Sequence, residues 1–191
     1  MKGEWCYYRR KYSAQVCEDI IRTAKSRPGK DATMGVSGEV QDNKFRKSKI
    51  RFVYPGDPQL DFLFADIWKM ALECNDEWFG FHLSKLDYLQ IAEYRAETLD
   101  EYRPHQDVFW LNGDAKYHRK LSVIIQLSNP YEYDGGDFEM YGVSEQPQDK
   151  SAIKDQGTVI FFPSFITHAA LPVTRGERYS IAAWINGPKF V

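Results

Sequence analysis

The sequence has few cysteines and no long apolar run. Its three cysteines, Cys6, Cys17 and Cys74, are odd in number and far apart. That pattern excludes a disulfide framework or a zinc knuckle and predicts free thiols in a reducing cytosol. No stretch approaches the length of a membrane-spanning helix, and the N-terminal MKGEWCYYRRKY lacks the apolar region of a signal peptide. We therefore expect a soluble, cytoplasmic protein with no membrane partner.

A strong net charge is also absent. The formal net charge is −2, which excludes a strongly basic surface overall, so no nucleic-acid partner is expected. A local basic patch could survive that average, and the candidate is KFRKSKIR at residues 44–51. We interpret this stretch as a solvated face, because most runs of like charge are.

The chain has enough apolar material for one core. Hydrophobic residues make up 43% of the sequence and aromatic residues 15%, which excludes global disorder. A length of 191 residues suits one well-packed domain and is short for two.

Helical patterns come first along the chain. Residues 13–27 begin with Ser13, a candidate N-cap, and carry an apolar stripe of helical period. Residues 57–75 repeat this period. Residues 28–49 are rich in Gly, Lys and Asp and predict a loop, and IRFVY at 50–54 predicts a short strand.

Strand patterns dominate from about residue 85. Short β-branched or aromatic segments are bounded there by Gly, Pro, Asn and Asp, which is typical of a sandwich or barrel. The segments are LDYLQIAEY, KLSVIIQLS, GDFEMYG, GTVIFFP and RYSIAAWI. We predict a mainly β fold with N-terminal helices, in which the helices buttress a double-stranded β-helix (jelly roll). The expected organisation is a single domain over 1–191, with helical support at about 13–75 and the jelly-roll core at about 85–188.

Two histidines and one aspartate suggest a metal site. In YRPHQD, His105 and Asp107 are two residues apart, so on a strand both side chains would point to one face. A lone His-x-Asp is weak, but His168 follows the apolar FFP segment and supplies a third ligand. Two imidazoles and one carboxylate leave about three positions open on an octahedral ion, as in non-haem Fe(II) oxygenases. A structural zinc site would be closed by four protein ligands.

A 2-oxoglutarate cosubstrate would need a fixed cation for its distal carboxylate, and Arg178 is the candidate. Guanidinium suits this role because its planar fork binds a carboxylate through two parallel hydrogen bonds. Arg175 competes, but TRGE predicts a turn that leaves Arg175 in solvent. Strand alternation in RYSIAAWI separates a ligand-facing set from a core-facing set. The first set is Arg178, Ser180, Ala182 and Trp184, and the second is Tyr179, Ile181, Ala183 and Ile185.

These segments together resemble the 2-oxoglutarate/Fe(II) dioxygenase superfamily, and within it the prolyl 4-hydroxylase-like branch. The resemblance runs from FRKSKIRF to AAWING, through LQIAEY, YRPHQD, RKLSVIIQLS, YDGGDFEMY and the segment from GTVIFFP to AAWI. It implies Fe(II), 2-oxoglutarate, dioxygen and ascorbate as a reductant. It further implies that Tyr94 reaches the cosubstrate and that Arg119 and Trp184 serve catalysis at the substrate. Asn186 departs from the pattern, because related hydroxylases tend to have histidine there.

The resemblance favours a hydroxylase of peptidyl proline, and a hydroxylase of a free amino acid or small metabolite stays open as the alternative. The retained Asp107 favours hydroxylation, because a small residue replaces this acid in the related halogenases. Nucleic-acid demethylases on the same fold carry a second arginine six residues after the first, where this chain has Trp184. A non-catalytic cupin-like binding module would need a broken triad, and this triad is intact.

Overall fold

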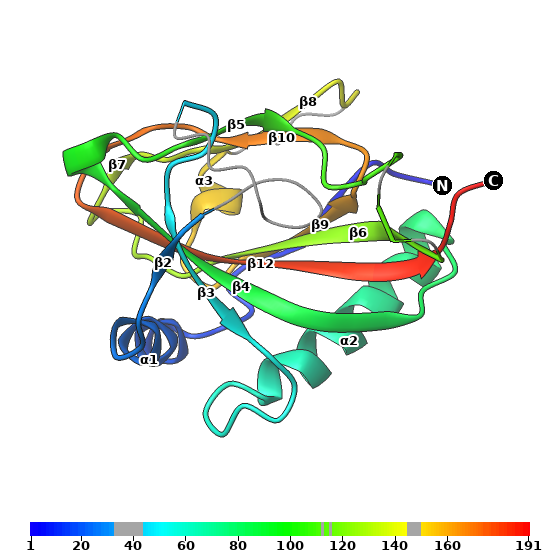
Figure 1. The fold of residues 1–191 in the computed structure, drawn as a ribbon, viewed down its shortest axis with the longest axis horizontal. Helices are drawn as coiled ribbons and strands as arrows, with labels where there is room; N and C mark the ends of the chain where they lie inside the picture. Colours follow the sequence, from blue (N-terminus) through cyan, green and yellow to red (C-terminus); the bar gives the residue numbers. More distant parts are fainter. Residues whose placement is uncertain (33–43, 112, 115, 145–149) are drawn as a thin grey trace.

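A large antiparallel sheet forms the centre of the protein (Figure 1). The structure, a computed structural model, describes residues 1–32, 44–111, 113–114, 116–144 and 150–191. Across the sheet the strands run β1 (Cys6–Tyr8), β9 (Val159–Pro163), β6 (Tyr117–Gln126), β12 (Glu177–Pro188), β4 (Lys85–Arg95), β3 (Lys49–Val53) and β2 (Lys30–Asp31). The central strand β12 pairs with β4 and β6, and Ile181 lies opposite both Ile91 and Ile125.

Two helices cover one face of this sheet, as the sequence predicts. They are α1 (Ala14–Lys25) and α2 (Phe62–Cys74), and Figure 1 shows both beneath the large sheet. The Ser13 side chain accepts a hydrogen bond from the backbone N–H of Val16 at 3.3 Å, so the predicted N-cap is confirmed. The helices and the strands of the large sheet share one apolar cluster. A π-helical turn, Asn75–Phe79, extends α2, and a 3-10 turn, Ala96–Thr98, follows β4.

The opposite face is covered by shorter strands, which completes the predicted jelly roll. One small sheet has the order β5 (Tyr102–His105), β10 (Thr167–Ala170) and β8 (Phe138–Tyr141). A second pairs β7 (Asp134–Gly135) with β11 (Val173–Arg175). A short helix, α3 (Lys150–Lys154), which the sequence patterns do not predict, precedes β9. Figure 1 shows β5, β10 and β8 above the large sheet, so the protein has a helix layer and two strand layers.

The prediction of three free thiols is wrong for two of them. Cys6 and Cys74 form a disulfide across 68 residues, whereas Cys17 is free and buried. The sequence does not predict this pairing, because the two cysteines are far apart in the chain. They meet because β1 joins the edge of the large sheet beside β9 and lies over the end of α2. Burial raises the pKa of the Cys17 thiol to about 12.

The segment from 28 to 49 is less uniform than predicted. It contains the two-residue strand β2, and β3 begins at Lys49, one residue before the predicted strand. The rest of the predicted loop falls largely on residues 33–43, which lie outside the described residues. In the described part of the chain, every helix is too short or too polar to cross a membrane.

Candidate metal and cosubstrate site

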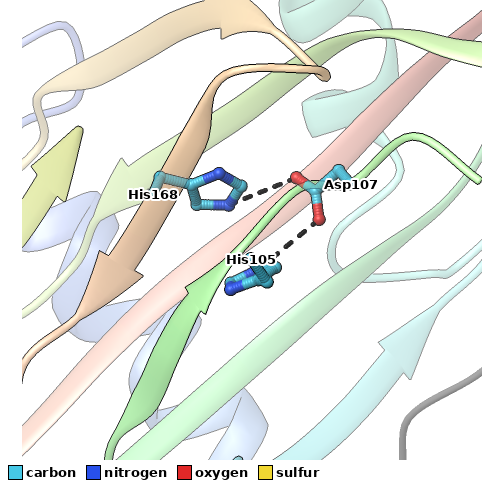
Figure 2. A group of neighbouring side chains, drawn as sticks. All are labelled: His105, Asp107 and His168. Carbon is cyan, nitrogen blue, oxygen red and sulfur yellow. Dashed lines mark ion pairs between the residues drawn. The ribbon is translucent and has the colours of Figure 1, made fainter. Parts of the chain in front are cut away.

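His105, Asp107 and His168 come together between the large sheet and the small sheet (Figure 2). His105 ends β5 and His168 lies on β10, directly opposite it in the strand register. The Nε2 atoms of His105 and His168 lie 3.7 Å and 3.4 Å from the two carboxylate oxygens of Asp107. One potential ligand atom from each residue lies within 4.8 Å of the others. The predicted grouping is therefore present, with the three side chains converging on one point.

Asp107 is positioned by a loop and not by a strand, which differs from the sequence interpretation. Strand β5 ends at His105, and the backbone N–H of Asp107 donates to the carbonyl oxygen of Ser164 at 2.9 Å. Ser122 donates its hydroxyl to Asp107 Oδ2 at 2.6 Å and lies 2.9 Å from the hydroxyl of Ser164. These bonds hold the carboxylate toward the two imidazoles without the support of a regular strand.

Backbone carbonyls hold both imidazoles in one tautomer. His105 Nδ1 lies 2.8 Å from the Arg103 carbonyl oxygen, and His168 Nδ1 lies 3.0 Å from that of Ile166. A carbonyl oxygen only accepts, so each Nδ1 carries a hydrogen, and each Nε2 is the nitrogen that can offer a lone pair to a metal. Metal-binding imidazoles are commonly oriented in this way.

The charges of the cluster suit a cation. Burial favours the neutral form of Asp107, but His168, His105 and Arg119 together lower its pKa to about 2. Burial and the neighbouring His168 lower the pKa of His105 to about 4. At neutral pH the site therefore offers an ionised carboxylate and a neutral His105, the protonation states that a divalent metal needs. The donor set fits Fe(II) on this chemistry.

Arg178 lies in the same cavity as the three side chains, and it is only 2% exposed. Its Nη2 donates to the side-chain oxygen of Gln126 at 2.9 Å, and its Nε has no partner among the described residues. The Tyr94 ring lies 5.3 Å from the guanidinium carbon and lines the same cavity. A Cβ on Gly136, where φ is +61°, would lie 2.9 Å from Arg178 Cδ, so glycine permits this close packing.

The predicted alternation of the last strand is present. Arg178, Ser180, Ala182 and Trp184 all line the cavity. Tyr179, Ile181, Ala183 and Ile185 all belong to the apolar cluster beneath the sheet. Arg175, the competing arginine, has a side chain that is 56% exposed and donates from Nε to Asp134 at 2.6 Å. It is therefore at the surface as expected, but it is ion-paired and not free.

Arg119 and Trp184 lie next to each other at the Asp107 side of the cavity. The Arg119 guanidinium is 4.0 Å from the centre of the Trp184 ring, and its Nη1 is 4.0 Å from Asp107 Oδ1. Its Nη2 donates to the Tyr88 hydroxyl at 2.8 Å. The indole N–H of Trp184 is buried and has no partner among the described residues. Asn186, where the family pattern is broken, lies opposite Arg119 in the strand register.

Several polar residues of the cavity were missed by sequence reasoning. Tyr102 stacks on His105 with ring centres 3.5 Å apart, and Gln90 and Arg46 also line the cavity. Glutamines in the middle of apolar strand segments, as in LQIAEY and VIIQLS, were the available signal, because a buried amide needs a partner. The interpretation of residues 44–51 as a solvated face is wrong, because Arg46, Ser48 and Ile50 are buried. From Phe45 on, the stretch alternates between half-buried and buried side chains as it enters β3.

Comparisons with known proteins agree with this geometry. The model of the 2OG-Fe(II) oxygenase superfamily matches residues 89–186, just over half of the chain. A PKHD-type hydroxylase of Hyphomonas neptunium is 37% identical over 74 residues, which are 39% of this chain and 32% of that protein. A PKHD-type hydroxylase of Maricaulis maris is 37% identical over 101 residues, which are 53% of this chain and 42% of that protein. The matches thus span less than half the length of these curated relatives.

Solved structures share the fold at low sequence identity. A Pseudomonas putida prolyl-4-hydroxylase superposes with a TM-score of 0.73 at 20% identity, covering 98% of this chain and 94% of that one. A Trichoplax adhaerens prolyl hydroxylase, bound to a hypoxia inducible factor oxygen degradation domain peptide fragment, gives a TM-score of 0.72 at 16% identity, with 96% and 83% covered. The matched segment contains all three side chains of the triad as well as Arg178, and we conclude that the chain belongs to the 2OG-Fe(II) oxygenase superfamily.

Proposed function

We propose that this protein is an Fe(II)- and 2-oxoglutarate-dependent hydroxylase, and that residues 1–191 act as one catalytic domain. The observation that carries the proposal is the pairing of a His-Asp-His cluster with the buried Arg178 in one cavity. Among the described residues, Arg178 has only a neutral amide as hydrogen-bond partner, and a buried cation without an anion is costly unless a ligand supplies one.

In this proposal His105, Asp107 and His168 hold Fe(II), which when bound activates dioxygen with electrons from the keto acid. The two Nε2 atoms and the carboxylate would be the protein ligands of the ion, and three protein ligands would leave positions for the cosubstrate and dioxygen. Ser122 keeps Asp107 directed at the ion, and the carbonyls of Arg103 and Ile166 keep the imidazoles from turning.

Arg178 and Tyr94 hold the cosubstrate in this proposal. The guanidinium binds the distal carboxylate of 2-oxoglutarate through two hydrogen bonds, one from the unpartnered Nε. Tyr94 lies against the guanidinium and limits its movement. Ascorbate acts as the reductant that keeps the iron in its Fe(II) state.

We further propose that the substrate is a proline residue in a peptide or protein, hydroxylated at carbon 4. The support is the resemblance to prolyl hydroxylases, together with Arg119 and Trp184 beside Asp107. The buried indole N–H of Trp184 is a donor that a substrate carbonyl could satisfy. Apolar contact with the indole ring suits the pyrrolidine ring of proline.

The test incubates the purified chain with Fe(II), 2-oxoglutarate and ascorbate against a panel of proline-containing peptides. Succinate release and a mass gain of one oxygen are measured together, and the modified carbon is located by fragmentation. We expect both signals with at least one peptide. If free amino acids stimulate succinate release and no peptide does, the peptide substrate is wrong. If metal-stripped protein is equally active, the whole proposal is wrong.

A further inference from the structure

A second buried guanidinium, that of Arg46, lines the same cavity as Arg178 and the triad. Arg46 is 8% exposed and forms an isolated backbone bridge with Tyr102. Its guanidinium carbon lies 4.4 Å from the centre of the Tyr102 ring, and the same ring stacks on the His105 imidazole with ring centres 3.5 Å apart. Arg46 is therefore one ring away from the proposed metal ligands.

In the described part of the chain, only neutral groups hydrogen-bond to this guanidinium. Nε donates to the Ser48 hydroxyl at 3.3 Å, and Nη2 donates to the side-chain oxygen of Gln90 at 2.6 Å. Among the described residues no carboxylate lies within ion-pair distance of Arg46, and Nη1 makes no hydrogen bond to them. Arg51 on β3 is different, because its Nη1 donates to Glu93 at 2.8 Å. The described residues of the sheet thus supply a carboxylate to Arg51 and none to Arg46.

Arg46 and Arg178 are held in the same manner. Each donates through Nη2 to a glutamine, Gln90 on β4 or Gln126 on β6. Such bonds fix the planar fork and leave other N–H groups of the same guanidinium for a ligand. The two guanidinium groups held in this way line one cavity. Among the residues that line this cavity, Asp107 supplies the carboxylate.

The proposed metal and cosubstrate do not balance this charge. Fe(II) carries two positive charges and 2-oxoglutarate carries two negative charges, so binding both adds no net charge to the cavity. The positive charge of the two guanidinium groups would therefore still exceed the negative charge of Asp107. A buried charge without a counter-charge costs free energy, which an anionic ligand can offset. The remaining candidate for that anion is the substrate.

We infer that Arg46 binds a carboxylate group of the substrate, and this inference rests on the proposed function. The substrate therefore carries a carboxylate close to the carbon that is hydroxylated. Two sources share this chemistry: the α-carboxylate of a free amino acid or C-terminal residue, and an acidic side chain next to the target residue in a peptide. A carboxylate accepts parallel hydrogen bonds from a guanidinium fork, and an amide cannot replace it at equal strength.

The experiment measures binding of matched probes by calorimetry, without dioxygen, to the chain loaded with Mn(II) and 2-oxoglutarate. One pair is N-acetyl-L-proline and its amide, and the other is acetyl-Pro-Glu-amide and acetyl-Pro-Gln-amide. We expect the acid of one pair to bind about ten- to a hundred-fold more tightly than its neutral partner, as a charge-assisted bond predicts. The pair that shows this preference identifies the source of the carboxylate.

Arg46→Gln should remove the preference, so that acid and amide bind alike, and Arg46→Lys should keep part of it. Arg22→Gln is the matched control, because it removes an equal charge from the exposed face of α1, away from the cavity, and should leave the preference intact. Thermal unfolding of each variant verifies the fold, and Arg46→Met, which also lacks the charge, replaces Arg46→Gln if the latter does not fold.

The inference is overturned if acids and amides bind wild type equally, if neither acid binds, or if the preference survives loss of Arg46. Failure of the proposed function looks different, because 2-oxoglutarate itself would then not bind. In that case the same four probes, tested on the chain with Mn(II) alone, still decide whether Arg46 binds a carboxylate.

Discussion

The two faces of β12 differ in what they do, although they share one backbone and the same neighbouring strands. The face toward α1 and α2 carries apolar side chains that are almost fully buried. The face toward the small sheet carries Arg178, Ser180, Ala182 and Trp184, all in the candidate site. Successive side chains of a strand point to opposite faces, so one strand can support a core and a site without either disturbing the other.

The same division continues on the strands beside β12. On β6, Val123 and Ile125 belong to the core cluster, whereas Ser122 supports Asp107 and Gln126 holds Arg178. On β4, Leu89 and Ile91 belong to the core, and Gln90 and Tyr94 line the cavity. Substitutions on the two faces should therefore separate stability from catalysis.

The largest expected effect is on the cavity face. We expect His168→Ala to abolish turnover and to weaken Fe(II) binding strongly, because one of three protein ligands is lost. Metal content and succinate release are the measurements, and the unfolding midpoint should change little. The exposed His82 is the control. Turnover by His168→Ala at the level of His82→Ala would contradict the assignment of the ligand.

The core face should respond in the opposite way. Ile181 is fully buried beneath the sheet, so Ile181→Ala should lower the free energy of unfolding by about 2–5 kcal/mol. Ile181→Val should cost about 0.5–1.5 kcal/mol. Urea unfolding measures both, and the folded variants should keep their metal stoichiometry. If Ile181→Ala instead changed metal binding with no loss of stability, the division between the faces would be wrong.

Arg175 on β11 and Arg178 on β12 test whether position relative to the cavity decides the role of an arginine. Arg178→Met removes a charge-assisted pair, so the KM for 2-oxoglutarate should rise about ten- to a hundred-fold while iron binding is kept. Arg175→Met removes an exposed ion pair with Asp134 and should leave the KM almost unchanged. A titration of 2-oxoglutarate in which Arg175→Met has the larger effect would show that the wrong arginine has been chosen.

The smallest effect concerns acid stability on the helix side. The Arg27 side chain and the backbone N–H groups of Gln59 and Leu60 hold the pKa of Asp57 below its usual range, although burial opposes them. A lowered folded-state pKa stabilises the protein above the unfolded-state pKa of about 3.9, and this contribution is lost as the pH falls through the folded-state pKa.

We therefore expect Asp57→Asn to reduce stability at pH 7 by about 1 kcal/mol or less, and by less still at low pH. Urea midpoints for wild type and variant at the two pH values measure this. A difference that grows at low pH would reverse the sign and contradict the argument. Iron binding at neutral pH should be equal in the two proteins, because Asp57 lies outside the cavity.

Much of the fold could be predicted because its signals are local. The helical period of residues 13–27, the Ser13 N-cap and the strand alternation of RYSIAAWI each depend on neighbours a few residues apart. The convergence of His105, Asp107 and His168 was predicted from spacing and confirmed in space, whereas their role as iron ligands stays a prediction.

Other features depend on which strands become neighbours. The pairing of Cys6 with Cys74 requires β1 to reach the sheet edge beside β9. The burial of Arg46 requires β3 to join β4, which places a basic stretch against Gln90 and Tyr102. Neither has a local signal, because the partners are separated by dozens of residues.

The sequence by itself determined the residue types of the site, the periodicity of each element and the family resemblance. The tertiary structure alone decided which polar side chains share the cavity, and that two guanidinium groups in it have only neutral partners among the described residues. The physical reason is that periodicity fixes the face on which a side chain lies, whereas the packing of the sheets fixes what that face meets.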